Sequence, residues 1–178
     1  VDGGWGAHDP VGRSVKSTYV VIVKWVAHRV SRARGRSEMQ KLVRIDSVQP
    51  RYNLLFLSFE RDLLPLCEEE AIAVIPYNPL AGGLLTGKHN RAAPPEQGTR
   101  FTVGRAGTMY QTRYWHERAF DTIEELRAVA KASAMSLAKL AVRWVLLNPA
   151  ITAPTIGASR PGQLDDSLPA GEQGSQPA

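Results

Sequence analysis

The sequence predicts an α/β fold built on a parallel sheet, and two observations carry that prediction. Short apolar runs of strand type alternate with stretches whose apolar residues recur at helical spacing. The strand-type runs cover residues 45–49, 71–76 and 151–156. A strand–helix–strand order repeated along a chain favours parallel strands joined by right-handed crossovers.

The segments between the strands predict helices and one long loop. Residues 59–70 have apolar side chains at helical spacing, and Pro65 within them is expected to kink the helix. Residues 118–132 and 136–147 predict two further helices, the second capped by its first residue, a serine. Residues 88–112 are expected to form a loop because Pro and Gly recur there.

Charge divides the chain unevenly. Residues 1–45 hold nine Lys/Arg and three Asp/Glu, whereas residues 46–178 hold thirteen and fourteen. We therefore expect residues 1–40 to be a basic, flexible segment, residues 41–168 to form the domain, and residues 169–178 to be a disordered tail. A solvated tail is the preferred interpretation of the basic segment over an arm that binds nucleic acid.

The single cysteine, Cys67, excludes a disulfide within the chain and is typical of a reducing compartment, so we expect a cytoplasmic protein. Cys67 falls on the apolar side of a predicted helix, which favours a packed thiol over a nucleophile. The apolar run at residues 19–23 is too short to span a bilayer, which needs about 20 residues, and no membrane association is expected. The histidines show no spacing typical of a metal site.

The most informative stretch is YNPLAGGLLTGK at residues 77–88, directly after a predicted strand. Its aromatic residue can support a flat ring, its two adjacent glycines let backbone N–H groups approach a ligand, and its lysine supplies charge for an anion. Gln49 ends a predicted strand, and Gly157 follows another. Ligands bind beyond the carboxyl ends of parallel strands, so the three motifs predict one site. The structural alternatives are a turn for the glycine loop, a Gln49 amide paired with backbone, a buried aromatic plug for Tyr77 and plain helix capping at the third motif.

These motifs, SVQPRYNLL at residues 47–55, YNPLAGGLLTGK and IGASRPGQL at residues 156–164, together resemble the C-terminal part of the aldo-keto reductase family. The resemblance covers about residues 41–168 and is closest to the branch of bacterial aldehyde reductases and potassium-channel β subunits. It implies the C-terminal portion of a (β/α)8 TIM-type barrel, an NADP-dependent oxidoreductase fold that reduces small aldehydes or ketones. A complete barrel needs about 250 residues. We therefore expect an incomplete barrel, a fragment from a truncated or frame-shifted reading frame.

The resemblance also implies roles for individual residues in binding NADP(H). Gln49 would hydrogen-bond the nicotinamide carboxamide, and Tyr77 would stack on the nicotinamide ring. Positions that line the pyrophosphate and ribose match Asn78, Leu80, Ala81 and Gly83, and positions near the adenine ribose and phosphates match Lys88 and Arg100. Positions at the 2′-phosphate match Gly157, Ser159, Arg160 and Gln163. Asp166 and Ser167 match adenine contacts that the family usually makes with Glu and Asn.

The resemblance supplies no catalytic residue, because the family's Asp, Tyr, Lys and His come from the first half of the barrel. The chain alone is therefore expected to be inactive. Unpaired strand edges favour self-association, although residues 19–23 offer a substitute strand for one edge. Two alternatives remain, a non-catalytic nucleotide-binding or regulatory module and a basic interaction protein whose N-terminal arm binds nucleic acid.

Overall fold

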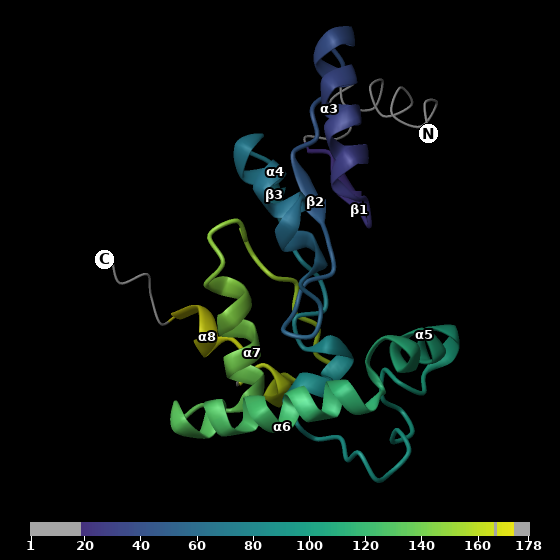
Figure 1. Cartoon of the computed structure of the whole chain (residues 1–178), viewed down its shortest axis with the longest axis vertical. Coiled ribbons are helices and arrows are strands. Elements are labelled where there is room, and N and C mark those ends of the chain that lie inside the picture. Colours follow the sequence, from purple (N-terminus) through teal and green to yellow (C-terminus); the bar gives the residue numbers. More distant parts are fainter. Residues whose placement is uncertain (1–18, 166, 173–178) are drawn as a thin grey trace.

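The computed structural model describes residues 19–165 and 167–172, and a small parallel sheet holds its N-terminal half together (Figure 1). The strands, in spatial order, are β1 (Val21–Val23), β2 (Ser47–Gln49) and β3 (Ala73–Val74). Val48 pairs with Ile22 on one side and with Val74 on the other, and both pairings are parallel. The predicted α/β class is confirmed.

Part of the segment expected to be flexible, residues 1–40, takes part in the fold instead. β1 pairs with β2, as expected for a substitute strand, and α3 (Ala27–Gln40) connects the two strands. Val30 and Ala33 of α3 are buried in one core with Ile22 of β1. The prediction for residues 1–18 lies outside the described residues. The net charge was a poor guide because α3 is packed on one side and still accommodates its basic residues: Arg29 and Arg32 are exposed, and the partly buried Arg34 is paired with Glu38 and Glu70.

Helices cover one face of the sheet. Ile22, Val48 and Val74 are buried with side chains from α3 and from α4 (Leu63–Glu69). Val21 and Val23, which alternate with Ile22 and so point to the other face, are 49% and 43% exposed. The second face of the sheet is therefore open along β1.

The helix predicted over residues 59–70 is divided in two. A short 3-10 helix, η1 (Ser58–Arg61), ends at Asp62, whose Oδ1 accepts a hydrogen bond from the Leu63 backbone N–H at 2.6 Å. Pro65 lies in the first turn of α4, where its missing N–H breaks no helical hydrogen bond, so no kink results. Cys67 is buried in α4, and burial raises the pKa of its thiol to about 11, as suits a packed thiol.

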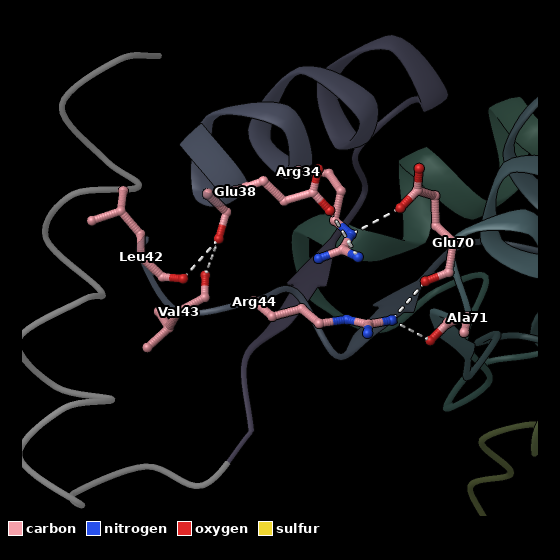
Figure 2. A network of polar contacts seen from close by, with 8 residues as sticks. Arg34, Glu38, Leu42, Val43, Arg44, Glu70 and Ala71 are labelled. Atoms are coloured by element: carbon pink, nitrogen blue, oxygen red, sulfur yellow. Dashed lines mark hydrogen bonds and ion pairs between the residues drawn. The ribbon is translucent and has the colours of Figure 1, made fainter. Parts of the chain in front are cut away.

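A polar network joins α3 to the end of α4 (Figure 2). The Arg34 guanidinium contacts Glu38 at 3.2 Å and Glu70 at 2.9 Å. Arg44 donates to the backbone carbonyl oxygens of Glu70 at 2.6 Å and Ala71 at 2.8 Å. A cation is stabilising at the carbonyl end of a helix. Because β3 begins two residues after Ala71, this network helps to place β3 beside β2.

A second core lies under the loop that follows β3. It is built from η2 (Ala81–Thr86), α5 (Gly104–Tyr114), α6 (Glu117–Ala132) and α7 (Leu137–Leu146). In Figure 1, α6 and α7 lie at the end of the molecule away from α3. Helix α5 occupies the last part of the predicted loop at residues 88–112. Ser136 accepts a hydrogen bond from the Lys139 N–H, which confirms the predicted cap.

Residues 151–156 run beside β3 as predicted, but only one isolated bridge forms. The N–H of Thr155 donates to the Pro76 carbonyl oxygen at 2.8 Å, and Tyr77 bridges to Thr155 in parallel. Pro154 has no N–H to donate, which interrupts the ladder. After η3 (Pro161–Gln163) the short helix α8 (Pro169–Glu172) occupies the first residues of the expected tail, and the prediction for residues 173–178 lies outside the described residues.

No helix within the described residues is long and apolar enough to cross a membrane. The same residues hold no group of three His, Cys, Asp or Glu side chains that could bind a metal ion.

Candidate functional site

The carboxyl ends of the strands bring Gln49 and Tyr77 to one face of the sheet. Arg51 bridges to Tyr77, and Tyr77 bridges to Thr155, both in parallel. Paired residues on neighbouring strands point to the same face, and so do residues two apart on one strand. Gln49, Arg51, Tyr77 and Thr155 therefore share the face opposite the helix-covered core. This is the arrangement expected for an aromatic platform beside an amide.

The sequence analysis did not identify Arg51 as a site residue, although Arg51 lies two residues after Gln49 and therefore points to the same face of the sheet. Its guanidinium carbon lies 3.5 Å from the centre of the Phe56 ring and 5.7 Å from that of Tyr114. Stacking on aromatic faces holds a guanidinium without neutralising it. The mouth of the site thus carries a positive charge near Tyr77.

The loop after Tyr77 uses its backbone N–H groups internally, contrary to the expectation that Gly82 and Gly83 offer them to a ligand. The Gly82 N–H donates to the Asn78 side-chain oxygen at 2.6 Å, and the Gly83 N–H donates to the Leu80 carbonyl at 2.8 Å. The Ala81 N–H donates to the Asn78 carbonyl at 3.0 Å. A ligand at this loop must therefore be held by side chains.

Two residues that the sequence analysis did not identify, Asn53 and Tyr114, hold Asn78 in place by hydrogen bonds. Its side-chain N–H donates to the Tyr114 hydroxyl at 3.0 Å, and the Asn53 amide donates to that hydroxyl at 3.1 Å and to the Asn78 carbonyl at 2.9 Å. Both ends of the Asn78 amide are thus engaged, so the residue shapes the loop. Burial raises the pKa of the Tyr114 hydroxyl, which keeps it neutral.

The remaining residues of the loop differ in what they offer. Ala81 is fully buried and Leu80 packs on the second core, so both support the loop from within. Gly83 has a φ of +102°, and the Cβ that another residue would carry there lies 4.0 Å from Lys88 Nζ. Lys88 and Arg100 are exposed, and Arg100 precedes Phe101, which is fully buried. The loop therefore presents two exposed cations, and Arg100 stands next to a buried residue.

The third motif is also satisfied internally. The Gln163 side-chain oxygen accepts hydrogen bonds from the Ser159 N–H at 2.8 Å, the Ser159 hydroxyl at 3.2 Å and the Arg160 N–H at 3.3 Å. Ser159 does not cap a helix, because η3 begins after Arg160 and is a single short turn. Gly157, Ser159, Arg160 and Gln163 are all exposed. The Arg160 guanidinium is the group that this motif leaves for an anion.

Two buried side-chain polar atoms in the described residues have no hydrogen-bond partner, His89 Nε2 and Ser167 Oγ. Ser167 is one of the predicted adenine contacts, and His89 follows Lys88. Asp166 lies outside the described residues. Buried polar groups are normally paired, so each of these two atoms calls for a partner, which a water or a ligand can supply.

The chain is similar to known oxidoreductases along nearly its whole length. The sequence profile of the Aldo/keto reductase family matches residues 19–175. The uncharacterized oxidoreductase YrpG of Bacillus subtilis is 32% identical over 168 residues, which are 94% of this chain and 48% of YrpG. A probable voltage-gated potassium channel subunit beta of Arabidopsis thaliana is 28% identical over 92% of this chain and 53% of its own length. Aflatoxin B1 aldehyde reductase member 2 of Homo sapiens is 33% identical over 71% of this chain and 38% of its own.

The chain spans about half the length of the curated relatives it matches. The family match begins at residue 19 and so includes β1 and α3, which moves the boundary expected at residue 41 toward the N-terminus. The parallel α/β sheet and the family match over residues 19–175 agree with one another. The chain belongs to the aldo/keto reductase family.

Proposed function

We propose that the chain binds NADP(H) at the carboxyl ends of its strands, as the C-terminal portion of a (β/α)8 barrel that reduces small aldehydes or ketones. The observation that carries the proposal is the shared face of Gln49 and Tyr77 at the carboxyl ends of neighbouring strands, and the segment that follows Tyr77 carries the exposed cations Lys88 and Arg100. A flat platform, an amide and separate cations match the nicotinamide and the phosphates of a dinucleotide. Family membership supports this choice of ligand.

In the proposed complex, Tyr77 supports one face of the nicotinamide ring and the Gln49 amide fixes its rotation. Because the sheet covers that side, the ring would offer its other face to substrate. Bound NADPH would supply hydride to the carbonyl carbon. Lys88, Arg100 and Arg160 would hold phosphate oxygens, and Ser167 would contact the adenine end.

Arg160→Ala is expected to reduce a preference for NADPH over NADH. The Arg160 guanidinium is exposed beside a motif whose N–H groups are already paired, so the side chain would carry much of the recognition of the 2′-phosphate. The loss of a charge-assisted contact is expected to cost about 1–2 kcal/mol with NADPH and little with NADH. Quenching of protein fluorescence measures both affinities at two salt concentrations. Equal affinities for both cofactors, unchanged by the substitution, would contradict the proposal.

We also propose that the 178-residue chain alone does not reduce carbonyls. Reduction needs a proton donor within hydrogen-bond reach of the carbonyl oxygen. The Tyr114 hydroxyl is buried, accepts hydrogen bonds from two amides and has a raised pKa, and the Tyr52 hydroxyl donates to Glu60. NADPH oxidation with a panel of aldehydes tests the proposal, and turnover would show that this chain has a proton donor.

A non-catalytic nucleotide-binding subunit is a second candidate. It is supported by the same engaged tyrosines and by the similarity to proteins described as potassium channel subunits. Binding of NADPH without turnover favours this candidate for the isolated chain. An arm that binds nucleic acid has less support, since Arg34 and Arg44 are engaged with Glu70 and the end of α4.

A further inference from the structure

The His89 ring is packed within an aromatic cluster, yet one of its nitrogens is left without a partner. The ring lies edge to face against Phe101 and Trp115, with centres 5.1 Å and 5.2 Å away. Its Nε2 is buried and makes no hydrogen bond within the described residues. An unpaired buried nitrogen costs stability, so its retention calls for an explanation.

The unpaired nitrogen lies near the side of Gly83 that would carry a Cβ, where the end of the Lys88 side chain also packs, with its Cε 3.7 Å from that position. The Cβ that another residue would carry at Gly83 lies 3.9 Å from His89 Nε2 and 4.0 Å from Lys88 Nζ. Gly83 has a φ of +102°, which residues with a side chain rarely adopt. A bare stretch of backbone, an ammonium group and an unpaired imidazole nitrogen thus surround one point.

An anion at this point would need side-chain donors. The Gly82 and Gly83 N–H groups are already paired with Asn78 and Leu80, as described above. Lys88 supplies the charge but only a mobile point contact, because its side chain is exposed. His89 can supply a fixed donor, since Phe101 and Trp115 hold its ring.

We propose that the His89 Nε2–H group donates a hydrogen bond to an oxygen of the diphosphate bridge of a bound dinucleotide, beside the Lys88 ammonium. The inference rests on the proposed function and deepens it. It adds His89 to the residues expected at the phosphates and gives its unpaired nitrogen a partner.

The charges around the ring make this contact sensitive to pH. Burial, and after it the charge of Lys88, lowers the pKa of His89, while Glu96 acts in the opposite direction. Phe101 and Trp115 add no titratable group. A diphosphate beside the ring favours the imidazolium form and so raises the pKa on binding. Binding is therefore expected to take up a proton, and affinity is expected to rise as the pH falls through the range in which His89 titrates.

The test is calorimetric titration of the full chain with NADH and with NADPH at about pH 6 and about pH 8, on either side of the ordinary histidine pKa. NADH is the main probe because the 2′-phosphate of NADPH itself titrates near pH 6. His89→Phe, which keeps an aromatic ring, should weaken both dinucleotides about tenfold and remove the proton uptake. His89→Gln, which keeps an N–H donor, should restore part of the affinity but not the pH dependence. His28→Gln, at an exposed histidine of α3, is the matched control and should change neither.

The outcomes separate this inference from the function on which it rests. If the unmodified chain binds the dinucleotides while His89→Phe leaves affinity and pH profile unchanged, the contact is wrong and the proposed function stands. A loss confined to NADPH would overturn the diphosphate assignment, because only the 2′-phosphate distinguishes the two probes. If the unmodified chain binds neither dinucleotide, both proposals fail. Should His89→Phe not fold, absence of proton uptake by the unmodified chain in two buffers would overturn the contact.

Discussion

Gly107→Ala is expected to lower the free energy of unfolding by about 3 kcal/mol, because it overpacks a buried contact between main chains. A Cβ at Gly107 would lie 2.8 Å from the Phe101 carbonyl oxygen and 3.1 Å from its carbon. Backbone atoms cannot move away from the added Cβ as the end of a flexible side chain can. The same carbonyl also accepts a hydrogen bond from the Gln111 side chain at 2.6 Å, which holds it in place. Urea unfolding followed by circular dichroism measures the change.

Gly35→Ala is the matched control within a helix. A Cβ at Gly35 meets no atom within 4 Å, and the residue is exposed in the interior of α3. Replacing a helical glycine in this setting is expected to stabilise the protein by about 1 kcal/mol. Equal losses of stability from both substitutions would contradict the steric argument. Because Phe101 follows Arg100 and packs on His89, Gly107→Ala should also weaken NADPH binding in the fraction that remains folded.

The parallel pairing of the strands, and the position of Gln49 and Tyr77 at the carboxyl ends of neighbouring strands, could be predicted from the sequence. Apolar runs of strand type and the rule that ligands bind at the carboxyl ends of parallel strands place Gln49 and Tyr77 together. The structure agrees with this placement of Gln49 and Tyr77. Arg51, which lies two residues after Gln49, pairs in parallel with Tyr77. The position of Arg51 follows from the same alternation, so it could have been predicted as well.

The fold of residues 19–40 could not be predicted from a count of charges. A net charge does not say on which side of a helix the charges lie. In α3, Val30, Ala33 and Ser37 are buried on one side, while Arg34 is held by Glu38 and Glu70. That last contact joins residues 36 positions apart in sequence, and only the packing of α3 against α4 brings them together.

The hydrogen-bond acceptors of the loop N–H groups also could not be predicted from the sequence. Glycines indicate that a backbone can approach a ligand, but they do not say which acceptors are already within reach. Here Asn78 adopts a φ of +67° and turns its side-chain oxygen onto the Gly82 N–H. Gln163 does the same for the start of η3. In both motifs the oxygen of an amide side chain takes the place expected for an anion.

Asn53→Ala is expected to lower the free energy of unfolding by about 3 kcal/mol, since it leaves a cavity and removes hydrogen bonds at a fully buried position. Its amide N–H groups hold the Asn78 carbonyl and the Tyr114 hydroxyl, and its oxygen accepts from the Leu55 N–H at 3.0 Å. The loop shaped by Asn78 should loosen as a result. We expect a weaker affinity for NADPH in the folded fraction, measured by fluorescence titration beside urea unfolding.

Tyr114→Phe measures the contribution of the hydrogen bonds to stability without creating the cavity that Asn53→Ala leaves. It removes the acceptor of two amide N–H groups while keeping the ring, so a loss of about 1–2 kcal/mol is expected. Tyr110→Phe, one turn earlier on α5, is the matched control, because no hydrogen bond of its hydroxyl is found within the described residues. A double substitution of Asn53 and Tyr114 should cost less than the two single losses together, because both act through Asn78.

The tyrosine also makes the network sensitive to alkali. Burial raises the pKa of Tyr114 above its usual 10.0, so the neutral form is favoured in the folded state. Its contribution to stability is therefore complete below about pH 10 and is lost as the pH rises toward the raised pKa. The stability difference between the unmodified chain and Tyr114→Phe should shrink over that range. A difference that stays constant from about pH 8 to about pH 11, across the ordinary tyrosine pKa, would show that the hydroxyl does not support the loop.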